Sequence, residues 1–188
     1  MHYAAGILPV TWHQGQALFL VGKDARDGTW SDFGGKCERC DKNDPLTTAA
    51  REFFEETYNL LVDGSVLRRR LHAGNTVLLR SRTQNAHPYY MYVAEVPYLP
   101  YLPRVVQRTL AFLRYRNLYK TCVEKTEVRW VTWEAMRSGD LPKRGVFRAT
   151  VEAHASSLAR IAAGKDSWED LCASCAATSP DPEEAWKA

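Results

Sequence analysis

The sequence has no hydrophobic run long enough to cross a membrane, because none of its apolar stretches approaches the length of about 18 residues that a spanning helix needs. Residues 1–6 carry neither a basic flank nor a long apolar region, so no secretory signal is expected. Cysteine is scarce and odd in number, with five in 188 residues, which argues against a closed disulfide framework. These absences predict an intracellular, cytoplasmic protein with no membrane partner.

Four of the five cysteines form two CxxC pairs, Cys37–Cys40 and Cys172–Cys175. A four-cysteine zinc site uses such pairs. Neither pair has the glycine-rich turn of a zinc knuckle, however, and 131 residues separate Cys40 from Cys172. We therefore expect reduced thiols that bind no zinc.

The length of 188 residues suits one domain with a substantial core. A hydrophobic content of 45% with 25% charged residues is ordinary for a globular protein. No internal repeat or domain boundary is evident, and the chain becomes polar from Gly164 onward. We expect one domain over residues 1–165, followed by a tail over residues 166–188, part of which is disordered.

Apolar and β-branched runs separated by polar turns predict a sheet with several helices. Strands are expected at 4–10, 17–21, 29–33, 66–71, 76–80, 89–96 and 127–132, and the first two form a hairpin. Helices are expected at 46–60, 105–119 and 145–163, the last as one closing helix, and a short turn or helix begins at Trp133. The helix at 105–119 belongs to an insert over residues 97–120, whose entry contains three prolines.

Residues 34–60 combine a glycine pair, a polar loop and a helix that carries clustered carboxylates. Pro45 suits the first turn of this helix. Glu52, Glu55 and Glu56 lie at positions i, i+3 and i+4 and therefore share one helical face. Like charges in this arrangement repel one another, and their oxygens are the ligands that Mg²⁺ prefers. The alternative is a solvated acidic face on which Arg51 screens Glu55.

The same stretch resembles the Nudix box. The family pattern is a glycine, five residues, a glutamate, seven residues, then Arg-Glu, an apolar residue, any residue, Glu-Glu, any residue, a glycine and an apolar residue. Gly35 begins the pattern and residues 51–56 match its core. Asp41 stands where the family has its first glutamate, and nine residues rather than seven follow it. Tyr58 replaces the closing glycine, where a left-handed backbone would be costly, although Asn59 could provide the cap.

This resemblance implies an α/β/α sandwich, of the mixed α/β (α+β) class, with a mixed sheet between helices. It also implies a hydrolase, dependent on Mg²⁺ or Mn²⁺, that cleaves a nucleoside diphosphate linked to another group. The implied metal ligands are the Gly34 carbonyl, Glu52, Glu55 and Glu56, with Glu52 as ligand or base. Arg51 would be structural, paired with Asp41 or Glu55.

Nudix proteins commonly bring one more carboxylate from a later loop or strand, as ligand or general base. Glu124 and Glu127 are the candidates in this chain. Glu124 is preferred, because a loop position ahead of the strand can move toward the metal. The alternative is that Glu127 simply begins a strand and Glu124 pairs with a nearby lysine.

Acidic residues are nearly absent from residues 64–120: Glu95 stands alone against ten basic residues, and seven of the nine tyrosines lie there. Arginine mixed with tyrosine suits phosphate contacts and base stacking. The candidate substrate-binding residues recur at multiples of four along the insert helix: Arg104, Arg108, Arg116 and Lys120. The alternative is a solvated surface with aromatic side chains in the core.

Three substrate classes therefore compete: small nucleotides, capped RNA 5′ ends and diphosphoinositol polyphosphates. The basic middle of the chain favours a heavily phosphorylated or polymeric substrate. A different class of function is a Nudix-like module that binds RNA without turnover. The inserted loop, Asp41 and Tyr58 support this second class, whereas the retained glutamates argue against it.

Overall fold

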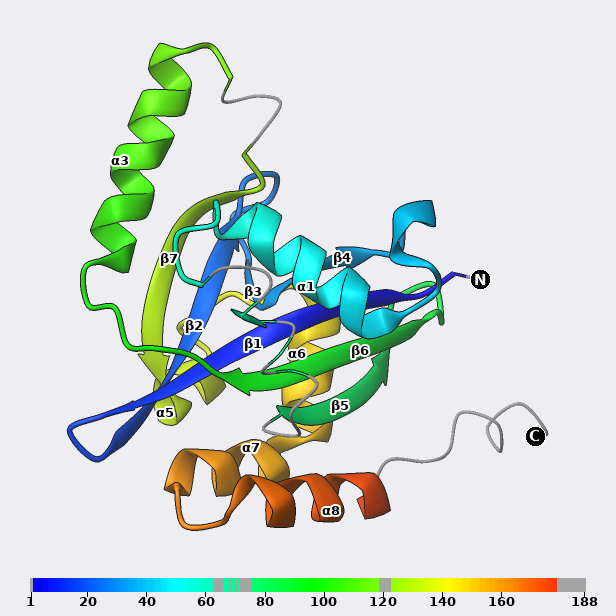
Figure 1. Cartoon of the computed structure of the whole chain (residues 1–188). Coiled ribbons are helices and arrows are strands. Elements are labelled where there is room, and N and C mark those ends of the chain that lie inside the picture. The colour runs from blue at the N-terminus through cyan, green and yellow to red at the C-terminus, as the bar shows by residue number, and fades with distance from the viewer. Residues whose placement is uncertain are drawn as a thin grey trace.

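The computed structural model describes residues 2–62, 66, 67, 69, 71, 76–118 and 123–178, with the side chains of 175–178 excluded. Seven strands in this part of the chain form one mixed sheet in the order β3-β2-β1-β6-β5, while β4 pairs with β1 and β7 with β2 (Figure 1). Only the pairing of β1 with β6 is parallel. The strands are β1 Ala4–His13, β2 Gln16–Asp24, β3 Trp30–Ser31, β4 Phe33–Lys36, β5 Thr76–Arg82, β6 Pro88–Glu95 and β7 Lys125–Thr132.

Helices cover both faces of this sheet (Figure 1). On one face, α1 (Pro45–Glu56) packs on β1 and β4, and α3 (Leu102–Tyr115) packs on β7. The opposite face carries α5 (Trp133–Arg137), α6 (Gly145–Ala153), α7 (Ala155–Ala163) and α8 (Trp168–Thr178). One apolar core contains Phe33 and Phe53, and a second contains Phe19 and Phe147. The α/β/α sandwich expected from the sequence is confirmed.

Helix α1 begins at a strong local signal. The Asp44 carboxylate accepts hydrogen bonds from the backbone amides of Leu46 and Thr47 at 3.2 and 3.1 Å, and Pro45 needs no amide partner in the first turn. A short 3₁₀ turn, η1 (Arg39–Asp41), lies in the loop before it. The helix ends at Glu56, four residues earlier than expected, because Tyr58 and Asn59 both adopt left-handed backbone angles (φ 55° and 54°).

Two predicted elements are wrong. Of residues 66–71, expected as a strand, those that the structure describes are helical. The expected single closing helix is broken at His154 (φ −113°, ψ 26°) into α6 and α7. There the His154 ring Nε2 lies 2.8 Å from the Arg80 carbonyl oxygen on β5, so a tertiary contact accompanies the break.

The segment expected as a C-terminal tail contains α8, which packs on β5. Leu171 is buried against the sheet, and the Cys172 thiol donates to the Thr76 carbonyl at 3.1 Å. The rest of that segment, residues 179–188, lies outside the described residues. Within the described range, no helix combines the length and the apolar character that a membrane span requires.

Candidate active site

The glycine pair of β4 lets the carboxylates of α1 approach the sheet. A Cβ atom on Gly35 would lie 2.5 Å from the carboxyl carbon of Glu52. On Gly34 it would lie 2.5 Å from the Gly6 Cα atom, and the Gly34 amide donates to Glu56 Oε2 at 2.8 Å. Both positions therefore require glycine, because the carboxylates of α1 and the backbone of β1 pack closely against them.

Arg51 connects the loop before α1 to the acidic face of the helix. Its Nε and Nη2 atoms each lie 3.0 Å from an Asp41 carboxylate oxygen, and these hydrogen bonds lower the pKa of Asp41 to about 2. Its Nη1 atom is 3.0 Å from both Glu52 Oε1 and Glu55 Oε2. Both partners named from the sequence, Asp41 and Glu55, are thus in contact with Arg51.

A lysine that no sequence pattern marks lies at the centre of the site. Lys125 has no exposed surface, although it begins a strand between two polar residues. Its Nζ atom lies 3.2 Å from Glu56 Oε1 and donates to Ser31 Oγ at 2.8 Å. No signal in the sequence could have found this pairing, because strands and helices far apart in the chain create it.

Burial makes two of the α1 carboxyls resist ionisation. Desolvation raises the pKa of Glu52 to about 7, against the opposing effect of Arg51. Desolvation also raises the pKa of Glu56 to about 8, against the opposing effect of Lys125. The charge of Glu124 raises both values further, so this loop carboxylate lies within electrostatic reach of the pair. A nearby cation would favour the ionised form of each group.

The other late carboxylate, Glu127, is placed differently. It lies on β7 opposite Lys23 of β2, and its Oε1 accepts from Arg129 at 2.8 Å. The charge of Glu124 thus acts on two carboxyls of α1, whereas Glu127 is in an ion pair on the strand.

The donor set suits a hard divalent ion in chemistry. Glu52 and Glu55 are close together, since each approaches the same Arg51 nitrogen, and the side chain of Glu55 is 52% exposed. Glu56 is engaged at both oxygens, by the Gly34 amide and by Lys125. No group of three or more Asp, Glu, His or Cys side chains in the described residues is arranged to hold one metal ion. Arg51 contacts one oxygen each of Glu52 and Glu55, so the site fits a cation through their other oxygens, whereas both oxygens of Glu56 are engaged.

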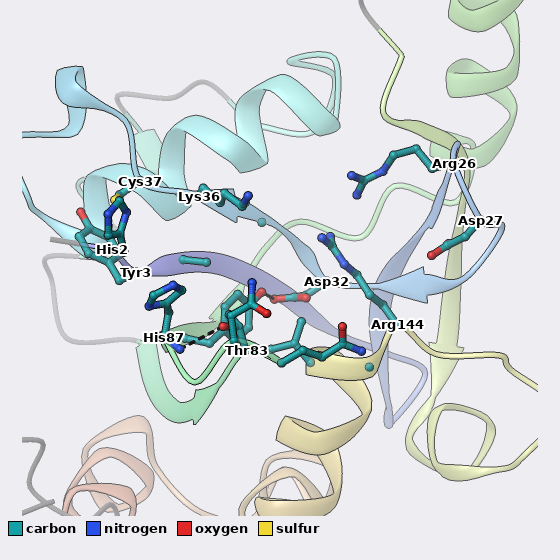
Figure 2. Close-up of a pocket in the computed structure, with 18 residues that line it drawn as sticks. His2, Tyr3, Arg26, Asp27, Asp32, Lys36, Cys37, Thr83, His87 and Arg144 are labelled. Atoms are coloured by element: carbon teal, nitrogen blue, oxygen red, sulfur yellow. Dashed lines mark hydrogen bonds between the residues drawn. The ribbon is translucent and has the colours of Figure 1, made fainter. Parts of the chain in front are cut away.

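A cavity of about 610 Å³ adjoins this site along the glycine pair of β4 (Figure 2). Three cationic side chains line it: Arg26, Lys36 and Arg144. Arg26 and Arg144 lie at the same end, where their guanidinium groups are 3.1 and 3.9 Å from the Asp24 carboxylate. Tyr3 and two histidines, His2 and His87, line the other end in Figure 2. Its volume is typical of a site for a small organic ligand.

A buried carboxyl lies in the wall of this cavity. Asp32 is 2% exposed and accepts a hydrogen bond of 2.5 Å from the Tyr89 hydroxyl. Burial raises the pKa of Asp32 to about 6. The sequence offered no reason to single out Asp32, Tyr89, Arg26 or Arg144, because a cavity assembled from five segments leaves no local pattern.

The basic residues of the insert helix lie elsewhere. Arg104 and Arg108 are exposed on α3, turned away from its buried face of Leu102, Val106 and Leu110, and Arg116 caps the helix end. None of these three arginines lines the cavity beside β4. Lys120 lies outside the described residues. The three described arginines of this group therefore lie outside the cavity.

Comparison with known proteins gives the fold. No protein-family model matches the sequence, and no curated protein matches it. Among solved structures, a Nudix hydrolase from M. smegmatis, RenU, has a TM-score of 0.50 and 18% identity, and the match covers 86% of this chain and 88% of that one. The C-terminal domain of mouse MUTYH, solved with human PCNA, also has a TM-score of 0.50, at 12% identity, with 85% and 90% covered. This chain has the fold of the Nudix hydrolases.

Proposed function

We propose that this protein is a divalent-metal-dependent hydrolase that cleaves the phosphoanhydride bond of a nucleoside diphosphate linked to another group. The observation that carries the proposal is the cavity of about 610 Å³, which is lined by Gly34 and Gly35, the two glycines that the Glu56 and Glu52 carboxyls of α1 approach. A substrate in this cavity would have cationic side chains around it and the Glu52 carboxyl beside it, across Gly35.

Mg²⁺ or Mn²⁺ would be held by Glu52 and Glu55. The Nudix box also implies the Gly34 carbonyl and Glu56 as ligands, but both oxygens of Glu56 are engaged, by the Gly34 amide and by Lys125. When bound, the ion would neutralise phosphate charge and lower the pKa of a bound water. Arg26 and Arg144 at one end of the cavity suit the phosphates, because arginine binds phosphate oxygens in a forked geometry. The aromatic rings at the other end suit a nucleobase or another planar group.

Proton transfer requires a carboxyl whose pKa is near the working pH. As a base, the alternative to its role as a ligand, Glu52 has this property, since burial raises its pKa to about 7 when no ion is bound to it. Glu124 is the second candidate base, because its charge acts on both Glu52 and Glu56. Glu127 is the weaker candidate, because its carboxylate is paired with Arg129.

The basic residues of α3 bear on the size of the substrate. Arg104 and Arg108 form an exposed basic surface outside the cavity. Capped RNA is long enough to occupy the cavity with its 5′ end and to contact such a surface with its chain, whereas a free nucleotide is not. A diphosphoinositol polyphosphate, like a nucleotide, would depend on the cations of the cavity itself.

The test is a substrate panel with the purified protein and Mg²⁺: ADP-ribose, dinucleoside polyphosphates, nucleoside triphosphates, capped RNA and a diphosphoinositol polyphosphate. We expect release of a nucleoside monophosphate or phosphate from at least one compound, and no release in chelator. Replacing Glu55 by Gln should lower turnover by about 10²-fold or more. Binding of RNA without turnover of any compound would instead support the non-catalytic module.

A further inference from the structure

Lys125 is held in place by four separate features of the fold. Tyr58, in its left-handed conformation after α1, donates its hydroxyl to the Lys125 carbonyl at 2.5 Å. Gly22 on β2 leaves room for the lysine side chain, because a Cβ there would lie 2.9 Å from Lys125 Cδ. The Ser31 hydroxyl accepts a hydrogen bond from Nζ at 2.8 Å, and Glu56 Oε1 lies 3.2 Å from Nζ. A fully buried lysine fixed in this way is a built part of the site.

The positive charge of the Lys125 ammonium group also favours the ionised form of several buried carboxyls. It opposes the raised pKa values of Glu56 and Asp32, and it helps to lower that of Asp24. It cannot reach a substrate from its buried position, since none of its surface is exposed. Its direct contacts lie inside the protein, on the carboxylate that the Nudix box assigns to a metal ion.

A divalent ion and this ammonium compete for the same oxygen. Glu56 Oε2 accepts from the Gly34 amide, so Oε1 is the oxygen that remains for a cation, and Lys125 is already bound to it. Two cations at one carboxylate oxygen in a buried site would repel each other strongly, because the effective dielectric constant there is low. Because Lys125 is already bound to Glu56, Glu56 does not fit the role of metal ligand that the Nudix box implies.

We propose that Lys125 is a resident cation that replaces a divalent ion at Glu56, so that metal binds this protein through Glu52 and Glu55 without Glu56. The inference rests on the proposed function, because it concerns the metal site of the same reaction. It makes Lys125 a positioning residue that sets how many ions the acidic face of α1 can hold.

The test counts metal ions directly, in the absence of substrate, by calorimetry with Mn²⁺ and by the electron paramagnetic resonance signal of free Mn²⁺. Lys125→Met removes the charge and keeps an unbranched apolar side chain beside Gly22. We expect this variant to bind one more Mn²⁺ per chain than the wild type, or to bind Mn²⁺ at least about tenfold more tightly, because a competing charge is gone. Lys125→Arg keeps the charge and should bind Mn²⁺ as the wild type does.

Two further variants assign the effect to Glu56. The double variant Lys125→Met/Glu56→Gln should lose the additional Mn²⁺, because the vacated carboxylate is removed with the lysine. In the wild-type background, Glu56→Gln should leave Mn²⁺ binding within about twofold of the wild type, whereas Glu55→Gln should weaken it about tenfold or more. If Lys125→Met folds only with Mn²⁺ present, its Mn²⁺-dependent melting temperature reports the same extra ion.

Equal Mn²⁺ number and affinity in the wild type and in Lys125→Met would overturn the inference. So would an equal loss of Mn²⁺ binding in Glu56→Gln and Glu55→Gln. These readouts need no turnover, so failure of the proposed function, seen as no hydrolysis of any panel compound, is distinguished from failure of the inference, seen in the ion count.

Discussion

Arg51 holds Asp41 through two parallel hydrogen bonds, with Nε to Oδ1 and Nη2 to Oδ2 each at 3.0 Å. The Asp41 side chain is 1% exposed, so this contact ties the loop containing η1 to α1 inside the protein. Thr48 also donates to Asp41, at 2.9 Å. The shorter carboxylate and the longer loop thus still reach the arginine, as the Nudix box implies for its first glutamate.

This pairing predicts a loss of stability in acid. The pKa of Asp41 is lowered to about 2 from an ordinary value of 3.8, so its ion pair stabilises the fold fully above about pH 4. That contribution should disappear as the pH falls from about 4 through 2, and it amounts to about 2 kcal/mol. Asp41→Asn should flatten the fall in unfolding free energy over this window, as measured by urea denaturation at a series of pH values. An unchanged slope in this variant would contradict the assignment.

The buried pair of Lys125 and Glu56 predicts that two neighbouring glutamates differ in their effect on stability. Glu56→Gln leaves the Lys125 ammonium buried without its counter-ion, and removing one partner of such a pair costs about 3 kcal/mol or more. Glu55 is half-exposed, so Glu55→Gln should change the unfolding free energy by less than about 0.5 kcal/mol. Thermal unfolding of both variants, each of which lacks one carboxylate of the wild type, measures this difference in stability. Similar melting temperatures would count against the ion pair.

The glycine of the box predicts a loss of activity without a loss of fold. Gly35→Ala places a methyl group 2.5 Å from the Glu52 carboxyl, which must then move. A displacement of about 1 Å in a catalytic group can cost about 10²-fold in turnover, and we expect a loss of that order. Gly139→Ala is the control, because nothing lies within 4 Å of a Cβ at that exposed position. If the two variants hydrolyse substrate equally fast, Glu52 has no role in the reaction.

Local patterns predicted the elements that build the site. β1 and β2 are apolar runs on either side of a polar turn, and α1 has a proline in its first turn and an apolar face. Both therefore follow from short-range patterns. The misassigned residues 66–71 show the limit of this reasoning. Leu67 and Leu71 are both buried, and their spacing of four residues fits a helix, but the run is short enough to be interpreted as a strand.

The rest of the site could not be predicted because it depends on contacts between distant segments. Lys125 is polar and begins a strand, and its burial is intelligible only with Gly22, Ser31 and Glu56 around it. Arg144, which lines the cavity, lies at the start of α6 and belongs to no recognisable sequence motif. The basic residues of α3 were visible in the sequence, but helical spacing alone does not tell whether they face the cavity.

The last prediction concerns those basic residues. Arg104 and Arg108 are exposed on α3 and do not line the cavity, so a free nucleotide bound there should not contact them. The double variant Arg104→Ala/Arg108→Ala should therefore leave KM and kcat for a small nucleotide unchanged. With a capped RNA substrate, KM should rise while kcat is preserved, because binding is lost equally in the ground state and the transition state.

Salt dependence separates a phosphate contact from a general effect of charge. Each phosphate contact to single-stranded RNA contributes about 0.7 to the slope of log affinity against log salt, so losing two contacts should reduce the slope by about 1.4. The matched control is Arg137→Ala/Arg148→Ala, which removes two exposed arginines from the opposite side of the sheet. We expect the control to retain the slope of the wild type. Should both double variants keep that slope, the arginines of α3 form a solvated surface, and the substrate is one that the cavity beside β4 can hold alone.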